Sequence, residues 1–182
     1  MPRRSLSWQV LCIRIRSHKG ECLTSPLQIS LLGDFRIVQG DEPVTGIENA
    51  RLQSLLAYLV LHRDAPQSRA QLSYLFWLDS TEAQARANLR KQVYHLRRAL
   101  ADADRFLYAD NKVLQWQPDA PFTLDVADFE KVLEQAENAE GSGDQAGLQE
   151  ALEQAAASYR GDLLPGCYDD WVLTERERLR QQ

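Results

Sequence analysis

The spacing of hydrophobic residues changes along the chain, and each change marks a different kind of element. Apolar and polar residues alternate over residues 27–31 (LQISL) and again over 35–37 (FRI), a period of two that is typical of a half-buried strand. The sequence therefore predicts a strand pair or one bent strand in this region. A turn is expected at 39–43, and Val44 is expected to begin a short third strand.

Two helices are predicted next, because apolar residues now recur every three or four positions. The first covers residues 52–60, and it is expected to end near 62–66, where a proline cannot continue a helix. The second is expected to begin at Ser68. Its hydroxyl would cap the helix while Gln71 reaches back, as in a capping box.

A third helix is predicted over residues 82–100, with Asp79 or Ser80 as its cap. One narrow stripe of this helix is apolar and is expected to face the core, and it consists of Leu89, Val93, Leu96 and Leu100. The remaining surface is basic or rich in hydrogen-bond donors, and it holds Arg86, Asn88, Arg90, Lys91, Tyr94, His95, Arg97 and Arg98. Arg86 lies closest to the apolar stripe, so an ion pair with Glu82 or Asp79 would compete with any outside ligand for it.

A hairpin is predicted directly after this helix. Two apolar runs, 106–109 and 112–116, are joined by Asp110-Asn111, a pair that tolerates the left-handed backbone of a tight turn. Lys112 would lie at the tip of this hairpin.

The rest of the chain is predicted to be helical. An antiparallel pair is expected at 125–140, capped by Asp125, and at 145–160, and a further helix is expected from 169 onward. The residues expected to face inward are Phe129, Val132, Leu133, Ala136, Leu148, Leu152, Tyr159, Trp171, Val172 and Leu179. One and a half helical units are typical of the beginning of a TPR-like array, so we expect the array to continue beyond these residues.

The predicted fold class is therefore an α+β winged helix-turn-helix domain followed by an incomplete all-α, TPR-like helical-repeat domain. The expected boundaries are a flexible N-terminal extension at 1–26, the winged helix at 27–117, a linker at 118–124 and the helical repeats at 125–182.

Charge is distributed unevenly along a chain whose formal net charge is -5. Residues 1–26 carry five Lys or Arg against one Glu, whereas residues 122–182 carry five against fourteen Asp or Glu. Between them, residues 85–100 hold four arginines and a lysine with no acidic residue. Such an asymmetry bears on the partners of each segment, and it marks the third helix as the one suited to a polyanion.

Membrane insertion, secretion and disulfide bonding are not predicted. The longest unbroken apolar run, residues 55–61, is far shorter than the roughly 20 residues of a membrane-spanning helix. The three cysteines, Cys12, Cys22 and Cys167, show no paired spacing, so they are expected to be reduced thiols of a cytoplasmic protein.

No catalytic, cofactor-binding or metal site is predicted either. The histidines His18, His62 and His95 lie far apart with no partner spacing for a metal or a triad. The GSGD stretch at 141–144 lacks the lysine of a phosphate-binding loop and follows no strand. We therefore expect a protein that is not an enzyme.

The exposed face of residues 82–100 has the chemistry needed to contact DNA. An α-helix fits the major groove, where arginine can bond both acceptors of guanine and asparagine those of adenine. A row of cations on a helix is most often only a solvated face. Here, however, a preceding helix and turn, and a following hairpin, complete the order of a winged helix-turn-helix.

The motifs in this order resemble a known family. The stretches LQISLLGDFRI, RLQSLLAYLVLH, SRAQLSYLFW and EAQARANLRKQVYHLRRAL, followed by a hairpin, resemble the winged helix of response-regulator-type transcription factors, in particular the SARP-type regulators of antibiotic pathways. The stretches LDVADFEKVLEQAE and YRGDLLPGCYDDWVLTERERLR resemble the opening of the bacterial transcriptional activator domain that follows this winged helix. The resemblance covers about residues 27–182.

This resemblance implies a sequence-specific activator that recruits RNA polymerase and often binds direct repeats as a homodimer. It assigns base and phosphate reading to the helix bearing Arg86 to Arg98, a backbone contact to the turn from Asp110 to Lys112, and a surface facing polymerase to residues 77–81. The runner-up hypothesis is a protein-interaction adaptor, in which the acidic helical repeats bind a partner and the winged helix is a structural module.

Overall fold

The computed structural model describes residues 25–182, so the expected N-terminal extension lies almost entirely outside the described residues. The first sheet has four strands, which in spatial order are β3 (Glu42–Pro43), β2 (Arg36–Gln39), β1 (Leu27–Ser30) and β7 (Phe122–Leu124). β1 and β2 are antiparallel, with Ile29 opposite Ile37, which confirms the predicted strand pair. The third strand begins at Glu42, and Val44 follows its end.

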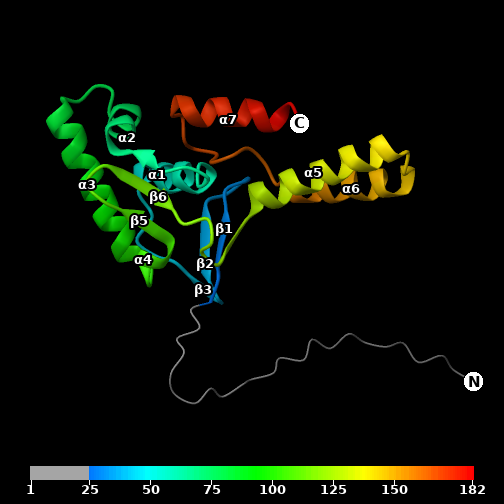
Figure 1. Ribbon diagram of the computed structural model, residues 1–182, viewed down its shortest axis with the longest axis horizontal. Coiled ribbons are helices and arrows are strands. Elements are labelled where there is room, and N and C mark those ends of the chain that lie inside the picture. Colours follow the sequence, from blue (N-terminus) through cyan, green and yellow to red (C-terminus); the bar gives the residue numbers. More distant parts are fainter. Residues whose placement is uncertain (1–24) are drawn as a thin grey trace, which may run out of the picture.

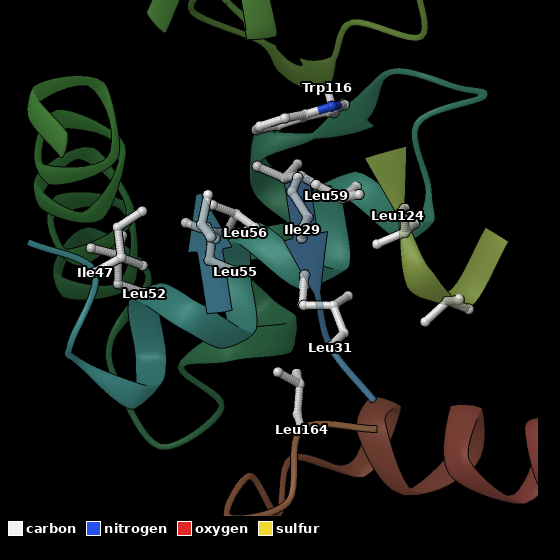
Figure 2. Packing of buried hydrophobic residues seen from close by; sticks show 14 of the residues in the cluster. Ile29, Leu31, Ile47, Leu52, Leu55, Leu56, Leu59, Trp116, Leu124 and Leu164 are labelled. Atoms are coloured by element: carbon white, nitrogen blue, oxygen red, sulfur yellow. The ribbon is translucent and has the colours of Figure 1, made fainter. Parts of the chain in front are cut away.

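One face of this sheet is covered by α1 (Ala50–Leu61), whose N-cap Asn49 accepts hydrogen bonds from the first turn. Figure 2 shows leucines of α1 packed against Ile29 of β1 and Leu31 just after it, with Trp116 and Leu124 completing the same cluster. All of these side chains are almost fully buried. The apolar side chains of the alternating segment 27–31 and those of the helical stripe at 52–60 therefore pack in one core.

The helices α2 (Arg69–Phe76) and α3 (Glu82–Ala99) pack on each other and on α1. The cap of α3 is Thr81, not Asp79 or Ser80. Thr81 Oγ1 accepts a hydrogen bond from the Gln84 backbone N–H, and the Thr81 N–H donates to Gln84 Oε1, which completes a capping box.

Ser68 precedes α2 as expected, but its hydroxyl makes no capping hydrogen bond. This is because Gln67–Ser68 form the short strand β4, and the pairing of β4 with the hairpin fixes the backbone at Ser68. The hairpin consists of β5 (Leu107–Ala109) and β6 (Val113–Trp116), so the second sheet has the order β4-β6-β5. A single turn of helix, α4 (Ala103–Phe106), precedes the hairpin and was not predicted.

The expected linker at 118–124 is wrong for its last three residues. Phe122–Leu124 form β7, which pairs in parallel with β1 at the edge of the first sheet. The Leu27 N–H also donates to the Pro121 carbonyl, so backbone hydrogen bonds continue one residue upstream. The chain therefore rejoins the edge of the first sheet directly before α5, where the second half begins.

Asp125, the expected cap of the next helix, has a different role. It is the first residue of α5 (Asp125–Ser142), and its carboxylate accepts hydrogen bonds from the backbone N–H groups of Leu31 and Leu32, at 2.8 and 2.9 Å, and of Val126. Burial raises the pKa of this carboxyl group despite those hydrogen bonds. Asp125 thus links the start of α5 to the two residues that follow Ser30, the last residue of β1.

α5 and α6 (Gln145–Ser158) form the expected antiparallel pair, which projects from one end of the molecule (Figure 1). Ala136, Ala151 and Ala155 are buried, whereas Leu152, predicted to face inward, is 50% exposed and Leu148 is half-buried. Small side chains allow two helices to approach closely, so the alanine face of α6 takes the interior and turns Leu152 outward.

The last helix, α7 (Asp170–Arg180), returns to the first half and lies over α1 (Figure 1). Trp171 donates from its indole N–H to the buried Ser54 hydroxyl, and the Asp169 carboxylate bonds both Ser54, at 2.6 Å, and Arg51, at 2.9 Å. The buried Arg176 donates to the carbonyls of Leu163, Leu164 and Cys167, which fixes the loop before α7. These contacts anchor the second half on the first.

Candidate nucleic-acid interface

α3 forms one end of the molecule, opposite the α5–α6 pair (Figure 1). Its predicted core stripe is confirmed, since Leu89, Val93 and Leu96 are buried, as is Leu100 just beyond the helix. Its outer surface is not covered by the acidic second half. The helix therefore presents one face to the protein and one to solvent.

The predicted contact residues lie on this outward side. Arg86, Arg90, Lys91, Tyr94, His95, Arg97, Arg98 and Lys112 are exposed, and Asn88 is half-buried. Arg90 and Lys91 make no hydrogen bond or ion pair with any other residue between 25 and 182. Unpaired cations in this position are free to bind an anion.

Two of the arginines make ion pairs inside the protein. Arg86 pairs with Glu82 at 2.5 Å, one helical turn earlier, and Arg97 pairs with Asp104 of α4 at 2.8 Å. Both pairs are solvent-exposed, and exposed pairs contribute only about 0.2–1 kcal/mol. Phosphate oxygens can therefore replace these carboxylates at little cost.

Arg98 and the aromatic residues on this helix interact with each other. The Arg98 guanidinium lies over the Tyr94 ring, 5.7 Å from its centroid, and also donates to the Tyr94 hydroxyl. The rings of Tyr94 and His95 are 5.7 Å apart. These contacts hold Arg98 against the helix surface with its charge still in solvent.

The hairpin turn next to α3 is held by Asp110. Its backbone N–H donates to the Val113 carbonyl, and its carboxylate accepts from the backbone N–H groups of Lys112 and Val113, each at 2.7 Å. Hydrogen bonds from Val113 and Lys112 lower the pKa of the Asp110 carboxyl group. Asp110 and Asn111 do not adopt the predicted left-handed backbone, because this carboxylate closes the turn instead.

Arg69 is a basic residue at this surface that the sequence analysis did not identify. Its backbone N–H donates to the Lys112 carbonyl, and its guanidinium donates to the Asp110 carbonyl at 3.0 Å. Burial, together with repulsion from Arg90 and Arg97, lowers its pKa, partly offset by attraction to Asp110. Arg69 lies forty-one residues before Asp110, so only the pairing of β4 with β6 reveals the arrangement.

These elements enclose a groove of about 540 Å³ between the start of α2, the outer side of α3 and the hairpin turn. Its lining includes Arg69, Arg86, Arg90 and Lys112, and its acidic member, Asp110, is already hydrogen-bonded within its own turn. The structure thus brings three of the predicted residues, Arg86, Arg90 and Lys112, to one positively charged groove. The other predicted residues lie along α3 outside this groove.

The turn between α2 and α3 carries the aromatic residue Trp77. This residue is half-buried and packs against the core, with its ring 5.9 Å from that of Phe76. Leu78 follows and is 57% exposed. The turn therefore presents an apolar side chain beside the basic helix.

No helix within 25–182 combines the length and apolar character needed to cross a membrane. The same residues contain no cluster of three or more His, Cys, Asp or Glu side chains that could hold a metal ion.

The fold defined by these elements, an α+β part joined to a helical part, is similar to that of a chain of known structure. The matched structure is that of Mycobacterium tuberculosis EmbR in complex with a low-affinity phosphopeptide, at a TM-score of 0.70 and 24% sequence identity. The match covers 85% of this chain and 42% of the EmbR chain, so this chain spans less than half the length of that protein.

Residues 124–182 match the family described as the bacterial transcriptional activator domain. This match starts at the last residue of β7 and runs through α5, α6 and α7. No curated protein matches the chain. The family match confirms the resemblance predicted for the second half of the chain, and the EmbR match shows a shared fold.

Proposed function

We propose that this protein is a sequence-specific, DNA-binding transcriptional activator that reads the major groove with α3. The observation that carries this proposal is the outer face of α3, where Arg90 and Lys91 are exposed and have no anionic partner in the described part of the chain. The match to the bacterial transcriptional activator domain supports the regulatory role.

The geometry around α3 suits a winged helix-turn-helix. α2 and its turn precede α3, and the hairpin β5–β6 follows it, as in proteins whose recognition helix enters the major groove. Arg90 and Arg97 are placed to bond guanine edges or phosphates, Asn88 to bond adenine, and Lys91 and Lys112 to contact the backbone. The short hairpin turn would lie on the DNA backbone next to that groove.

The remaining roles in the proposal follow from the family resemblance. Recruitment of RNA polymerase would use the turn between α2 and α3, where the exposed Leu78 supplies an apolar contact. Binding to direct repeats would bring two copies of the protein side by side on one face of the DNA.

The second candidate is the protein-interaction adaptor. Its supporting observation is the α5–α6 pair, which projects from the rest of the molecule (Figure 1). The solvent side of this pair is acidic and includes the exposed Leu152. In that case α3 would have no ligand, and its charges would only keep the surface solvated.

Fluorescence anisotropy with labelled duplex DNA separates the two candidates. A pool of random duplexes is first selected on the protein, and the recovered duplex is then titrated between about 50 and about 200 mM salt. We expect the logarithm of the affinity to fall linearly with the logarithm of salt concentration, with a slope of roughly 0.9 for each phosphate contact.

Three variants provide the matched comparison in this assay. Arg90→Ala is expected to weaken binding by about 1–3 kcal/mol if it reads a guanine, whereas Lys91→Ala is expected to weaken binding to all sequences and to reduce the salt slope by about 1. Lys131→Ala, at an exposed position on α5, is expected to leave both quantities unchanged. Absence of duplex binding at low salt, or equal effects of all three variants, would favour the adaptor.

A further inference from the structure

We propose that the groove between α2, α3 and the hairpin turn is a binding site for a single phosphate group of the DNA backbone, with Arg69 as its central residue. This inference rests on the proposed DNA binding and adds a specific phosphate contact to it. It also places a residue of α2, rather than of α3, at that contact.

The first observation is the balance of charge around the groove. Four cationic side chains line it, from Arg69, Arg86, Arg90 and Lys112. The single carboxylate in the lining, that of Asp110, accepts hydrogen bonds from two backbone N–H groups of its own turn. The net charge of the lining is therefore positive, although Arg86 also pairs with Glu82, which lies outside the lining.

The second observation is the uncapped start of α2. The Ser68 hydroxyl makes no capping hydrogen bond, and the first turn of the helix contains no acidic residue. Ser68, Arg69 and Ala70 all line the groove. The N-terminus of a helix carries partial positive charge and N–H groups that point outward, which suits it to an anion.

The third observation is independent of charge. Ser73 lines the same groove and is only 3% exposed, yet its hydroxyl has no hydrogen-bond partner. A buried polar group without a partner normally has one supplied by water, an ion or a ligand. Ser73 therefore adds to this wall of the groove a buried polar side chain with no partner among the described residues.

Arg69 is held in place before any ligand arrives. Its backbone pairs with Lys112, and its guanidinium donates one hydrogen bond to the Asp110 carbonyl, which leaves its other N–H donors available. Repulsion from the nearby Arg90 and Arg97 is relieved when an anion binds among these cations. A phosphate in the groove would thus connect α2, α3 and the hairpin turn.

The test uses the full chain and the duplex selected above, with one backbone phosphate at a time replaced by an uncharged methylphosphonate. We expect one linkage on each half-site at which neutralisation weakens wild-type binding about 10-fold or more, in line with the loss of one charged hydrogen bond. In Arg69→Gln, the same neutral linkage should have no further effect. Glutamine keeps an N–H donor for the Asp110 carbonyl, and thermal unfolding checks that the hairpin remains folded.

The outcomes distinguish this inference from the function on which it rests. If no duplex binds at low salt, both are overturned. If duplexes bind but Arg69→Gln weakens every substituted duplex by the same factor, Arg69 is only structural, and this inference alone is overturned.

A second arm tests free phosphate as the source of the ligand. Inorganic phosphate is titrated against the protein while the backbone amides of Ser68 to Ala70 are followed by NMR. Saturation at low millimolar phosphate, with no linkage coupled to Arg69 in the duplex assay, would assign the groove to a free anion and overturn the proposal. We expect only weak shifts with phosphate alone, and their loss in Arg69→Gln.

Discussion

α3 and α5 are helices of equal length, 18 residues each, with opposite surroundings. α3 packs on α1, α2 and α4, and its solvent side is basic. α5 packs mainly on α6, and its solvent side includes Asp128, Glu134, Glu137 and Glu140. Each helix buries an apolar stripe, so amphipathicity alone does not tell them apart. The sign of the exposed charge, and the elements beside it, decide which helix suits DNA.

α3 and the α5–α6 pair also differ in how they are attached to the rest of the protein. α3 is fixed on several sides and adjoins a hairpin closed by Asp110. The α5–α6 pair extends away from the sheet and is joined to it through β7 and Asp125 at its base. A surface that must match the DNA groove needs the first arrangement, because a misplaced recognition helix loses its base contacts.

The largest difference is expected in stability. Leu96→Ala removes a fully buried side chain from under α3 and should lower the free energy of unfolding by about 2–5 kcal/mol. Leu152→Ala, on the exposed side of α6, should change it by no more than about 0.5 kcal/mol. Urea unfolding followed by circular dichroism measures both. Similar losses for the two variants would show that the packing difference described here is wrong.

The next largest effect concerns charge reversal. Arg90→Glu combined with Lys91→Glu should reduce duplex affinity about 100-fold or more at low salt, because two attractive contacts become repulsive. The matched reversal on the other helix, Lys131→Glu, should change the affinity less than twofold at about 0.1 M salt, where exposed charges beyond a Debye length of roughly 10 Å are screened. Anisotropy titration gives both values. A large loss for Lys131→Glu would mean that the acidic pair also lies at the DNA.

A smaller effect of the opposite sign is expected at Arg97. Asp104→Ala removes its ion-pair partner and should increase duplex affinity about 2- to 5-fold, in line with the low strength of an exposed pair. Asp128→Ala on α5 removes an equal charge and should have no effect. The gain should disappear in Arg97→Ala/Asp104→Ala. A gain that persists in the double variant would show that Arg97 does not take part.

The smallest effect is the pH dependence of the hairpin turn. The pKa of Asp110 is lowered because its ionised form accepts backbone hydrogen bonds from Val113 and Lys112. Its contribution is therefore complete above the ordinary carboxyl pKa and is lost as the pH falls through the lowered value. Carboxyl NMR titration should show Asp110 titrating below its usual range, with DNA binding unaffected by this group near neutral pH. Titration of Asp110 above that range would contradict the turn geometry.

Much of the fold follows from the hydrophobic pattern of the sequence. The alternation over 27–31 and the stripe from Leu89 to Leu100 depend only on local periodicity, and both are observed. The features that were missed depend on distant pairing. β7 is a strand because β1 offers it an edge, and Ser68 fails to cap because β6 pairs with its backbone.

In the candidate site, too, the sequence predicted local features but not contacts between residues that are far apart in the chain. The basic face of α3 is visible from residue spacing, and the competing pair between Arg86 and Glu82 was expected from it. Arg69 was not identified, because its neighbours Asp110 and Lys112 are distant in sequence. The pair between Arg97 and Asp104 was also missed, since it depends on the unpredicted turn α4.

The central claim, that α3 and not α5 meets the DNA, is tested most directly by NMR of the isotope-labelled chain titrated with the selected duplex. We predict that backbone amide signals of α3 and of Asp110 to Lys112 shift or broaden, while those of α5 and α6 stay in place. Shifts confined to α5 and α6, or spectra unchanged by duplex at low salt, would contradict the account.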